Sequence, residues 1–283
     1  MKFYFVTTDH LETRIWFRDD DDFKAGMNYV AVAAAKTGVA VVAFILMSNH
    51  VHFLLLCEDW EAKRFIDLFK KLYGTYFGRR YNTKRFLRRN NVDIQVITTA
   101  EEAVERVIAY IIMNSVAARI CLHAGFYKWG SGACYFNNNK EIGAPLSSMS
   151  AREQIRTLKS NETLPQNWKV GAEGYILPES YVQVTLVERL YKTPSRMSYF
   201  LNTSSKAKRA LAQEGFSFRD QLIQEGMKDL LVSMGKKDRD ELSKKEQAEL
   251  LKQLRWRFSA DVHQISRVSG YSYSEVTELL NSL

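Results

Sequence analysis

The order of strand and helix patterns along the chain predicts an α+β fold. Short runs rich in β-forming residues alternate with stretches of helical spacing, in the order β-α-β-β-α-β-α, over residues 1–120. This order predicts an antiparallel sheet with helices packed on one face. After residue 184 only helical patterns occur, so we also expect an α-helical C-terminal extension.

The chain opens on a strand over residues 2–7 and continues into a capped helix. The acidic run Asp19–Asp22 precedes the helical pattern, which Gly38 ends. Carboxylates at a helix N-terminus complement the helix dipole, so we interpret this run as a cap rather than as a metal site.

The next elements complete the predicted sheet. They are strands over 39–46 and 51–56, a helix over 61–80 and a strand over 92–97. Thr99 and Glu102 have the spacing of a capping box. They open a further helix, which we expect to run through Ile120.

The rest of the chain divides into two parts. Residues 137–183 are rich in Gly, Pro, Asn and Ser and predict a linker or wrapping loop between a domain over 1–136 and a helical region over 184–283. Two short helical patterns near the C-terminus flank Gly270 with the spacing of a helix-turn-helix. Many small helical hairpins share this spacing, so the motif is weak.

Composition limits the class of protein. Of the 283 residues, 46% are hydrophobic, which suffices for a real core. The three cysteines are widely spaced, which argues against a disulfide framework and a zinc ribbon. We find neither a signal-peptide pattern nor an apolar stretch long enough to span a membrane, and therefore expect a cytoplasmic protein without a membrane partner.

The positive charge is concentrated in one segment. The formal net charge is +8, and residues 63–89 hold ten basic side chains and one acid. Aromatic residues are interleaved with these cations, a combination suited to single-stranded nucleic acid. An amphipathic helix with a solvated face is the alternative. The predicted DNA-binding residues are Lys70, Lys71, Arg79, Arg80, Lys84, Arg85, Arg88 and Arg89.

Two histidines two residues apart form the first candidate site. Side chains alternate along a strand, so His50 and His52 project from the same face and could share a divalent metal. The alternative is that backbone carbonyls or water satisfy each ring.

A tyrosine and an asparagine on a later helix form the second candidate site. Tyr110 and Asn114 are four residues apart and therefore lie on one stripe of the helix. A phenol can attack a phosphodiester that a metal holds, and an amide oxygen could be a third metal ligand. Four other tyrosines are plausible nucleophiles on chemistry alone, namely Tyr73, Tyr76, Tyr81 and Tyr127.

Three motifs in order over residues 1–136 resemble the single-tyrosine HUH nucleases, and most closely their REP-associated tyrosine transposase branch. The His-hydrophobe-His signature corresponds to 47–52, the Tyr-Ile-x-x-Asn-Pro-x-x-Ala pattern to 110–118, and the Tyr-x-Trp-Ser-Ser segment to 127–131. Ser48 and Ser115 replace prolines of the family, and Gly130 replaces a serine. With Ser115 we expect the helix to continue straight where relatives end or kink.

The resemblance implies a fold and an activity. It implies a ferredoxin-like sheet, with His50 and His52 as ligands of Mg²⁺ or Mn²⁺ and Asn114 as a third ligand or an orienting group. Tyr110 would form a 5′-phosphotyrosine bond with single-stranded or hairpin DNA, as in nicking and strand transfer by transposases. Such proteins are monomers or homodimers. The alternatives are a non-catalytic DNA-binding regulator and a structural or RNA-binding protein with core histidines.

Overall fold

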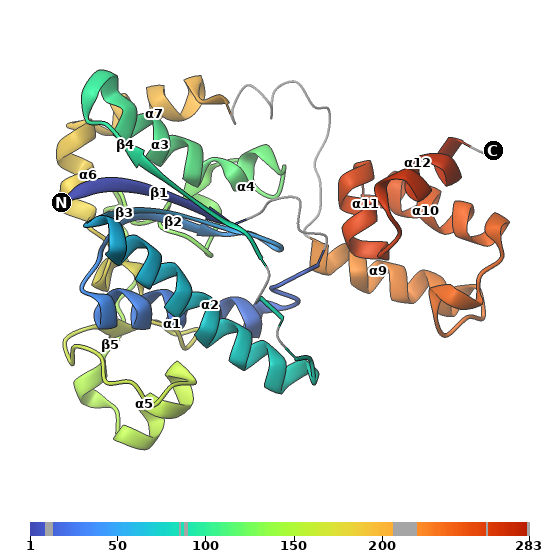
Figure 1. The fold of residues 1–283 in the computed structure, drawn as a ribbon, viewed down its shortest axis with the longest axis horizontal. Coiled ribbons are helices and arrows are strands. Elements are labelled where there is room, and N and C mark those ends of the chain that lie inside the picture. The colour runs from blue at the N-terminus through green and yellow to red at the C-terminus, as the bar shows by residue number, and fades with distance from the viewer. Residues whose placement is uncertain (9–13, 85, 88–89, 206–219, 259, 282–283) are drawn as a thin grey trace.

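A four-stranded antiparallel sheet organises the computed structural model, which describes residues 1–8, 14–84, 86–87, 90–205, 220–258 and 260–281. Its strands are β1 (Lys2–Thr8), β2 (Ala40–Leu46), β3 (Val51–Cys57) and β4 (Val92–Ile97). They lie in the order β2-β3-β1-β4 with every neighbouring pair antiparallel. This topology confirms the predicted α+β class, and the strand order is that of a ferredoxin-like sheet (Figure 1).

Helices cover both faces of the sheet (Figure 1). The crossover helices α1 (Asp20–Thr37) and α2 (Asp59–Tyr81) share one face, as the sequence predicts. The opposite face carries α3 (Ala103–Ile112), so the expectation of helices on one face needs correction. The reason is the broad apolar stripe of α3, with Val104, Ile108 and Ile111 all buried, which requires a partner surface.

The acidic run caps α1 as expected. The Asp19 side chain accepts a hydrogen bond from the Asp22 backbone N–H, and Gly38 ends the helix at φ 72°. Asp22 itself is fully buried and accepts from the side chains of Tyr76, Tyr81 and Arg80. One residue of the run therefore caps the helix, while another holds α1 against α2.

The helix that begins after Thr99 is shorter than predicted. The Thr99 side chain makes no capping hydrogen bond, and α3 ends at Ile112 before a separate turn, α4 (Asn114–Ala117). The Asn114 side-chain amide donates to the carbonyl oxygens of Tyr110, at 2.9 Å, and Ile111, at 3.0 Å. The Asn114 amide competes with backbone N–H groups for those two carbonyls, which interrupts the helix. The expectation that Ser115 lets the helix continue straight is therefore wrong.

Residues 129–131 cover the outer edge of β2. The Leu46 N–H donates to the Trp129 carbonyl, and the Ser131 N–H donates to the Phe44 carbonyl. A β-carbon on Gly130 would lie 2.8 Å from the Phe44 oxygen, which is too close for any larger residue. This close approach explains the glycine where the resembling family has serine.

The segment 137–183 wraps around α1. It contains α5 (Ala151–Leu158) and the short strand pair β5 (Ala144–Pro145) and β6 (Lys169–Val170). The Asn28 side chain of α1 donates to the Thr157 carbonyl and accepts from the Ile176 N–H. The wrapping-loop alternative therefore describes this segment better than a linker.

Buried side chains form two cores. The first extends from the sheet to α6 (Val184–Tyr191) and α7 (Pro194–Thr203). The second joins the last four helices, α9 (Asp220–Ser233), α10 (Lys244–Phe258), α11 (Val262–Ser269) and α12 (Tyr273–Asn281). The cores thus group residues 184–201 with the sheet and not with the C-terminal helices. Throughout the part of the chain that the structure describes, no helix is long and apolar enough to cross a membrane.

Candidate active site

The two histidines stand where β3 begins, in the middle of the sheet. His52 is paired with Thr7 of β1 and Ile45 of β2, and His50 closes a turn in which the Met47 N–H donates to its carbonyl. The ring centroids of His50 and His52 are 4.9 Å apart. His52 is buried and His50 is half-buried, so only one ring of the pair is open to solvent.

Asn49 orients the His50 ring. The His50 Nδ1 lies 2.9 Å from the Asn49 Oδ1. An amide oxygen can only accept, so Nδ1 carries the proton and donates. In the neutral ring the lone pair then resides on Nε2. A fixed tautomer of this kind is typical of a histidine that binds a metal.

Tyr110 of α3 packs against His52, the buried member of the histidine pair. Its ring centroid is 5.9 Å from that of His52 and 5.9 Å from that of Phe5. Phe5 in turn stacks on His52 at 5.7 Å with nearly parallel planes. The structure therefore brings Tyr110, His50 and His52 into one cluster, although they come from elements about 60 residues apart in the sequence.

Asn114 lies one helical turn beyond Tyr110 and is buried. Its amide N–H groups donate back to the Tyr110 and Ile111 carbonyls. The amide oxygen is consequently the atom of this group that can bind a cation.

The competing tyrosines use their hydroxyls elsewhere. Tyr73 donates to the Trp16 carbonyl and Tyr127 to the Leu46 carbonyl, while Tyr76 and Tyr81 donate to Asp22. Burial raises the pKa of Tyr73 well above its ordinary value, and it also raises the pKa values of Tyr76 and Tyr81. These contacts are structural and make all four side chains poor nucleophiles.

Two of the three candidate metal ligands are imidazole nitrogens, and the third is an amide oxygen. Within the described ranges, no group of three or more His, Cys, Asp or Glu side chains could hold a metal ion. Two imidazoles and one amide oxygen fit a divalent cation that keeps open positions for phosphate oxygens. Metal binding by His50, His52 and Asn114 stays a prediction.

A pocket of about 390 Å³ opens beside Tyr110. It lies between β4, α3 and α7 and combines aromatic rings, a side-chain amide and a guanidinium. Its lining residues are Phe5, Gln95, Ile97, Arg106, Val107, Tyr110, Phe200, Thr203, Ser204 and Ser205. Rings and hydrogen-bonding groups together suit an unstacked nucleobase.

Of the residues that line this pocket, sequence reasoning predicted only Tyr110 as a site residue and missed, among others, Gln95, Arg106 and Phe200. Arg106 could have been found, since it precedes Tyr110 by four residues on the same helical stripe. Gln95 and Phe200 come from β4 and α7, and only the tertiary fold brings them to Tyr110.

The basic segment faces away from this cluster. Phe53 packs against Phe65 and Phe69 of α2, whereas the neighbouring His52 packs against Tyr110 of α3. Because successive residues of a strand point to opposite faces, α2 lies across the sheet from the candidate site. DNA that contacts both would have to pass around an edge of the sheet.

Two of the predicted DNA-binding cations serve the fold. Arg80 forms ion pairs with Asp19 and Asp22, each at 2.7 Å. Lys70 donates to the Asn90 carbonyl, and its burial lowers its pKa. Both side chains therefore already have partners within the fold, and their contact with DNA stays a prediction.

The other cations of the segment remain candidates for phosphate contacts. Lys71, Arg79 and Lys84 are exposed. Arg85, Arg88 and Arg89 lie outside the described residues. Most of the interleaved aromatics cannot stack on bases because they are buried, namely Phe65, Phe69, Tyr73, Phe77 and Phe86.

Comparison with known proteins adds little to these observations. No protein-family model and no curated protein matches the chain. A solved structure, a REP-associated tyrosine transposase bound to a REP hairpin, is similar at 10% identity and a TM-score of 0.34. The match covers 46% of this chain and 76% of that chain. We base the functional proposal on the side chains themselves.

Proposed function

We propose that this protein nicks and rejoins single-stranded DNA, with Tyr110 as the nucleophile. The observation that carries the proposal is the contact of the Tyr110 ring with His52 beside His50, at the edge of a pocket. A non-catalytic DNA-binding protein has no use for a phenol against two imidazoles.

The proposed reaction is a transesterification at phosphorus. The Tyr110 Oη attacks the scissile phosphodiester, a P–Oη bond forms and the P–O3′ bond breaks. The phenolic proton passes to solvent, and the departing 3′ oxygen takes up a proton. The product is a 5′-phosphotyrosine and a strand with a free 3′ hydroxyl. Attack by such a 3′ hydroxyl on the phosphotyrosine reverses the step and transfers the strand.

His50, His52 and the Asn114 amide oxygen are the groups that would hold Mg²⁺ or Mn²⁺. A divalent cation there supplies charge neutralisation on the phosphate oxygens as the bond to the phenol forms. Asn49 keeps the His50 lone pair directed through Nε2, and Phe5 holds the His52 ring by stacking. These residues fix the donors before the substrate arrives, which reduces reorganisation during the reaction.

The pocket beside Tyr110 favours a single-stranded substrate at the cleaved bond. A base can enter this pocket only when it is unstacked from its neighbours. Arg106 and Gln95 can then contact a phosphate or a base edge. Hairpin-bearing DNA, in which single strand flanks a duplex, remains the expected substrate.

A nicking assay with end-labelled hairpin oligonucleotides tests this proposal. The protein is incubated with Mg²⁺ or Mn²⁺ and with DNA that carries its label at the 5′ or at the 3′ end. We expect a denaturant-resistant protein adduct with the 3′ label and a released fragment with the 5′ label. Hairpin binding without cleavage in either metal would reject the enzyme and favour a DNA-binding regulator.

A further inference from the structure

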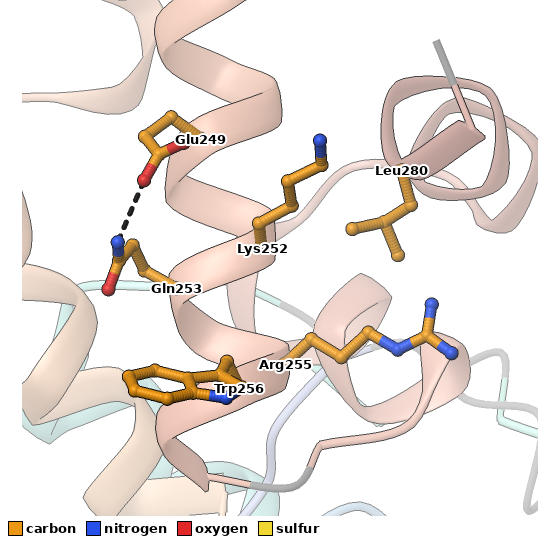
Figure 2. A pocket seen from close by; sticks show the side chains of 6 residues that line it. All are labelled: Glu249, Lys252, Gln253, Arg255, Trp256 and Leu280. Atoms are coloured by element: carbon orange, nitrogen blue, oxygen red, sulfur yellow. Dashed lines mark hydrogen bonds between the residues drawn. The ribbon is translucent and has the colours of Figure 1, made fainter. Parts of the chain in front are cut away.

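A second aromatic and basic surface lies on the C-terminal helices, away from Tyr110. A pocket of about 650 Å³ opens between α10 and α12. It is lined by Glu249, Lys252, Gln253, Arg255, Trp256 and Leu280 (Figure 2). We call this surface the α10 patch.

Trp256 is the most unusual member of the α10 patch. Its side chain is 84% exposed, whereas the C-terminal core is built from aliphatic side chains such as Leu250, Leu251 and Leu254 of the same helix. Residues 249, 252, 253 and 256 follow helical spacing and therefore share one face of α10. Folding of α10 thus leaves an indole on its polar face, available to a ligand.

The charge around Trp256 is locally positive. Residues 220–281 as a whole carry ten cations and eleven acids, but between Glu249 and Asp261 the chain has Lys252, Arg255 and Arg257 and no acid. Figure 2 shows Lys252 and Arg255 extending from α10 on the side of Leu280. Cations at a helix C-terminus also complement the dipole, yet this effect does not account for an exposed indole beside them.

The one acid of the α10 patch is engaged within the helix. Gln253 donates to the Glu249 carboxylate at 2.7 Å (Figure 2). The Arg257 Nε donates to the Gln253 side-chain oxygen at 2.9 Å. This chain of hydrogen bonds along α10 partly compensates the Glu249 charge. Lys252 and Arg255 add two positive charges to the pocket that Trp256 lines.

We propose that the α10 patch is a second binding site for single-stranded nucleic acid. One unpaired base stacks on Trp256, and the flanking phosphates contact Lys252 and Arg255. An indole face accepts any base, and cations track the sugar-phosphate backbone, so the site binds without sequence preference. The proposal is independent of the nuclease chemistry at Tyr110.

Fluorescence anisotropy with a labelled, hairpin-free oligothymidylate tests the site in the full-length chain. Because stacking contributes substantially per base, we expect W256A to weaken binding by roughly five- to 100-fold and W256F to retain most of the affinity. K252A and R255A should each lower the slope of log affinity against log salt by about 0.7.

Matched controls come from the same chain. Trp60 is also exposed, at 60%, with Arg64 above its ring, but it lies on α2 outside the patch. Lys244 is exposed at the opposite end of α10. W60A and K244A should leave the affinity within twofold, and circular dichroism should show the same helix content in every variant.

Equal affinities for W256A and the unmodified chain would overturn the proposal. So would a concentration-dependent dimer that W256A dissociates, because the patch would then be an interface between two copies. Cleavage of hairpin DNA is the separate readout for the nuclease, and the α10 patch is tested by oligothymidylate affinity alone. Loss of cleavage alone would therefore count against the proposed function and not against this site.

Discussion

Tyr110 is held by its ring, so its hydroxyl can be removed without dismantling the site. The ring contacts Phe5 and His52, and these contacts need no phenolic oxygen. A phenylalanine at this position keeps both ring contacts and removes the proposed nucleophile. Among single substitutions at the candidate site, Tyr110→Phe therefore separates catalysis from packing most clearly.

The first prediction concerns this substitution. Tyr110→Phe should abolish the covalent adduct, with at least a thousandfold loss of cleavage, because no other group can form the bond to phosphorus. Hairpin affinity should stay within twofold, and the free energy of unfolding should change by less than about 1.5 kcal/mol. Gel electrophoresis, anisotropy and urea denaturation measure the three quantities.

The control is Tyr199→Phe, which alters an exposed tyrosine. Adduct formation by Tyr110→Phe would show that the nucleophile is misassigned.

The second prediction contrasts two neighbouring arginines. Arg80→Ala removes the partner of the buried Asp22 carboxylate and should cost about 2 kcal/mol of unfolding free energy. Arg79 is exposed, and Arg79→Ala should change that quantity by less than about 0.5 kcal/mol. The affinity for hairpin DNA should show the reverse pattern. It should fall for Arg79→Ala and stay unchanged for Arg80→Ala. If Arg80→Ala weakens hairpin binding while its stability is unchanged, the structural role of Arg80 is wrong.

Among the elements, the strands were easier to predict than the ends of the helices. The run of β-formers at 51–56 forms β3 as predicted, with His52 on the strand and His50 directly before it, because alternation along a strand is a local property. The end of α3 depends on the Asn114 side chain turning back onto two carbonyls, a choice that the sequence leaves open. Spacing therefore predicted which residues share a face and did not predict where the helix stops.

The third prediction concerns the capping boxes of α10 and α12. Glu246 accepts from Ser243, and Glu275 accepts from Ser272; these hydrogen bonds lower the pKa of each carboxyl below its ordinary value of 4.5. A lowered pKa in the folded state means that the stabilisation is present above pH 4.5 and is lost as the pH falls through the folded value.

Glutamine variants test this pH dependence. Gln can still close a capping box but carries no charge, so Glu246→Gln and Glu275→Gln should flatten the change in melting temperature between pH 6 and pH 3. Glu278→Gln, on the exposed side of α12, is the control. Identical pH profiles for all variants would contradict the capping role of these carboxyls.

In the whole molecule, the candidate site and the basic helix lie on opposite sides of the sheet. The sequence located His50, His52, Tyr110 and the cations of 63–89 but could not show that α2 and α3 cover different faces. Likewise, the pocket beside Tyr110 joins β4, α3 and α7, which are separated by up to 100 residues. Both features arise from tertiary packing, which residue spacing does not encode.

The fourth prediction follows from this separation of binding and chemistry. Removal of divalent metal with EDTA should abolish cleavage, because the negative charge on the attacked phosphate is then not neutralised. Hairpin binding should persist, since cations on the protein surface provide it. His52→Ala should reproduce the effect of EDTA even with metal present, whereas His263→Ala, on α11, should cleave normally. Full cleavage in EDTA would exclude a metal role for the histidine pair.

The central claim is that Tyr110 becomes covalently linked to DNA, and peptide mapping of the trapped adduct tests it most directly. Trypsin cleaves after Arg106 and Arg119, and Tyr110 is the sole tyrosine of the peptide 107–119. After nuclease trimming of the adduct, mass spectrometry should find this peptide heavier by a nucleotide that is attached through phosphate to Tyr110. A nucleotide on any other tyrosine peptide, or an adduct without a modified tyrosine, would contradict the account.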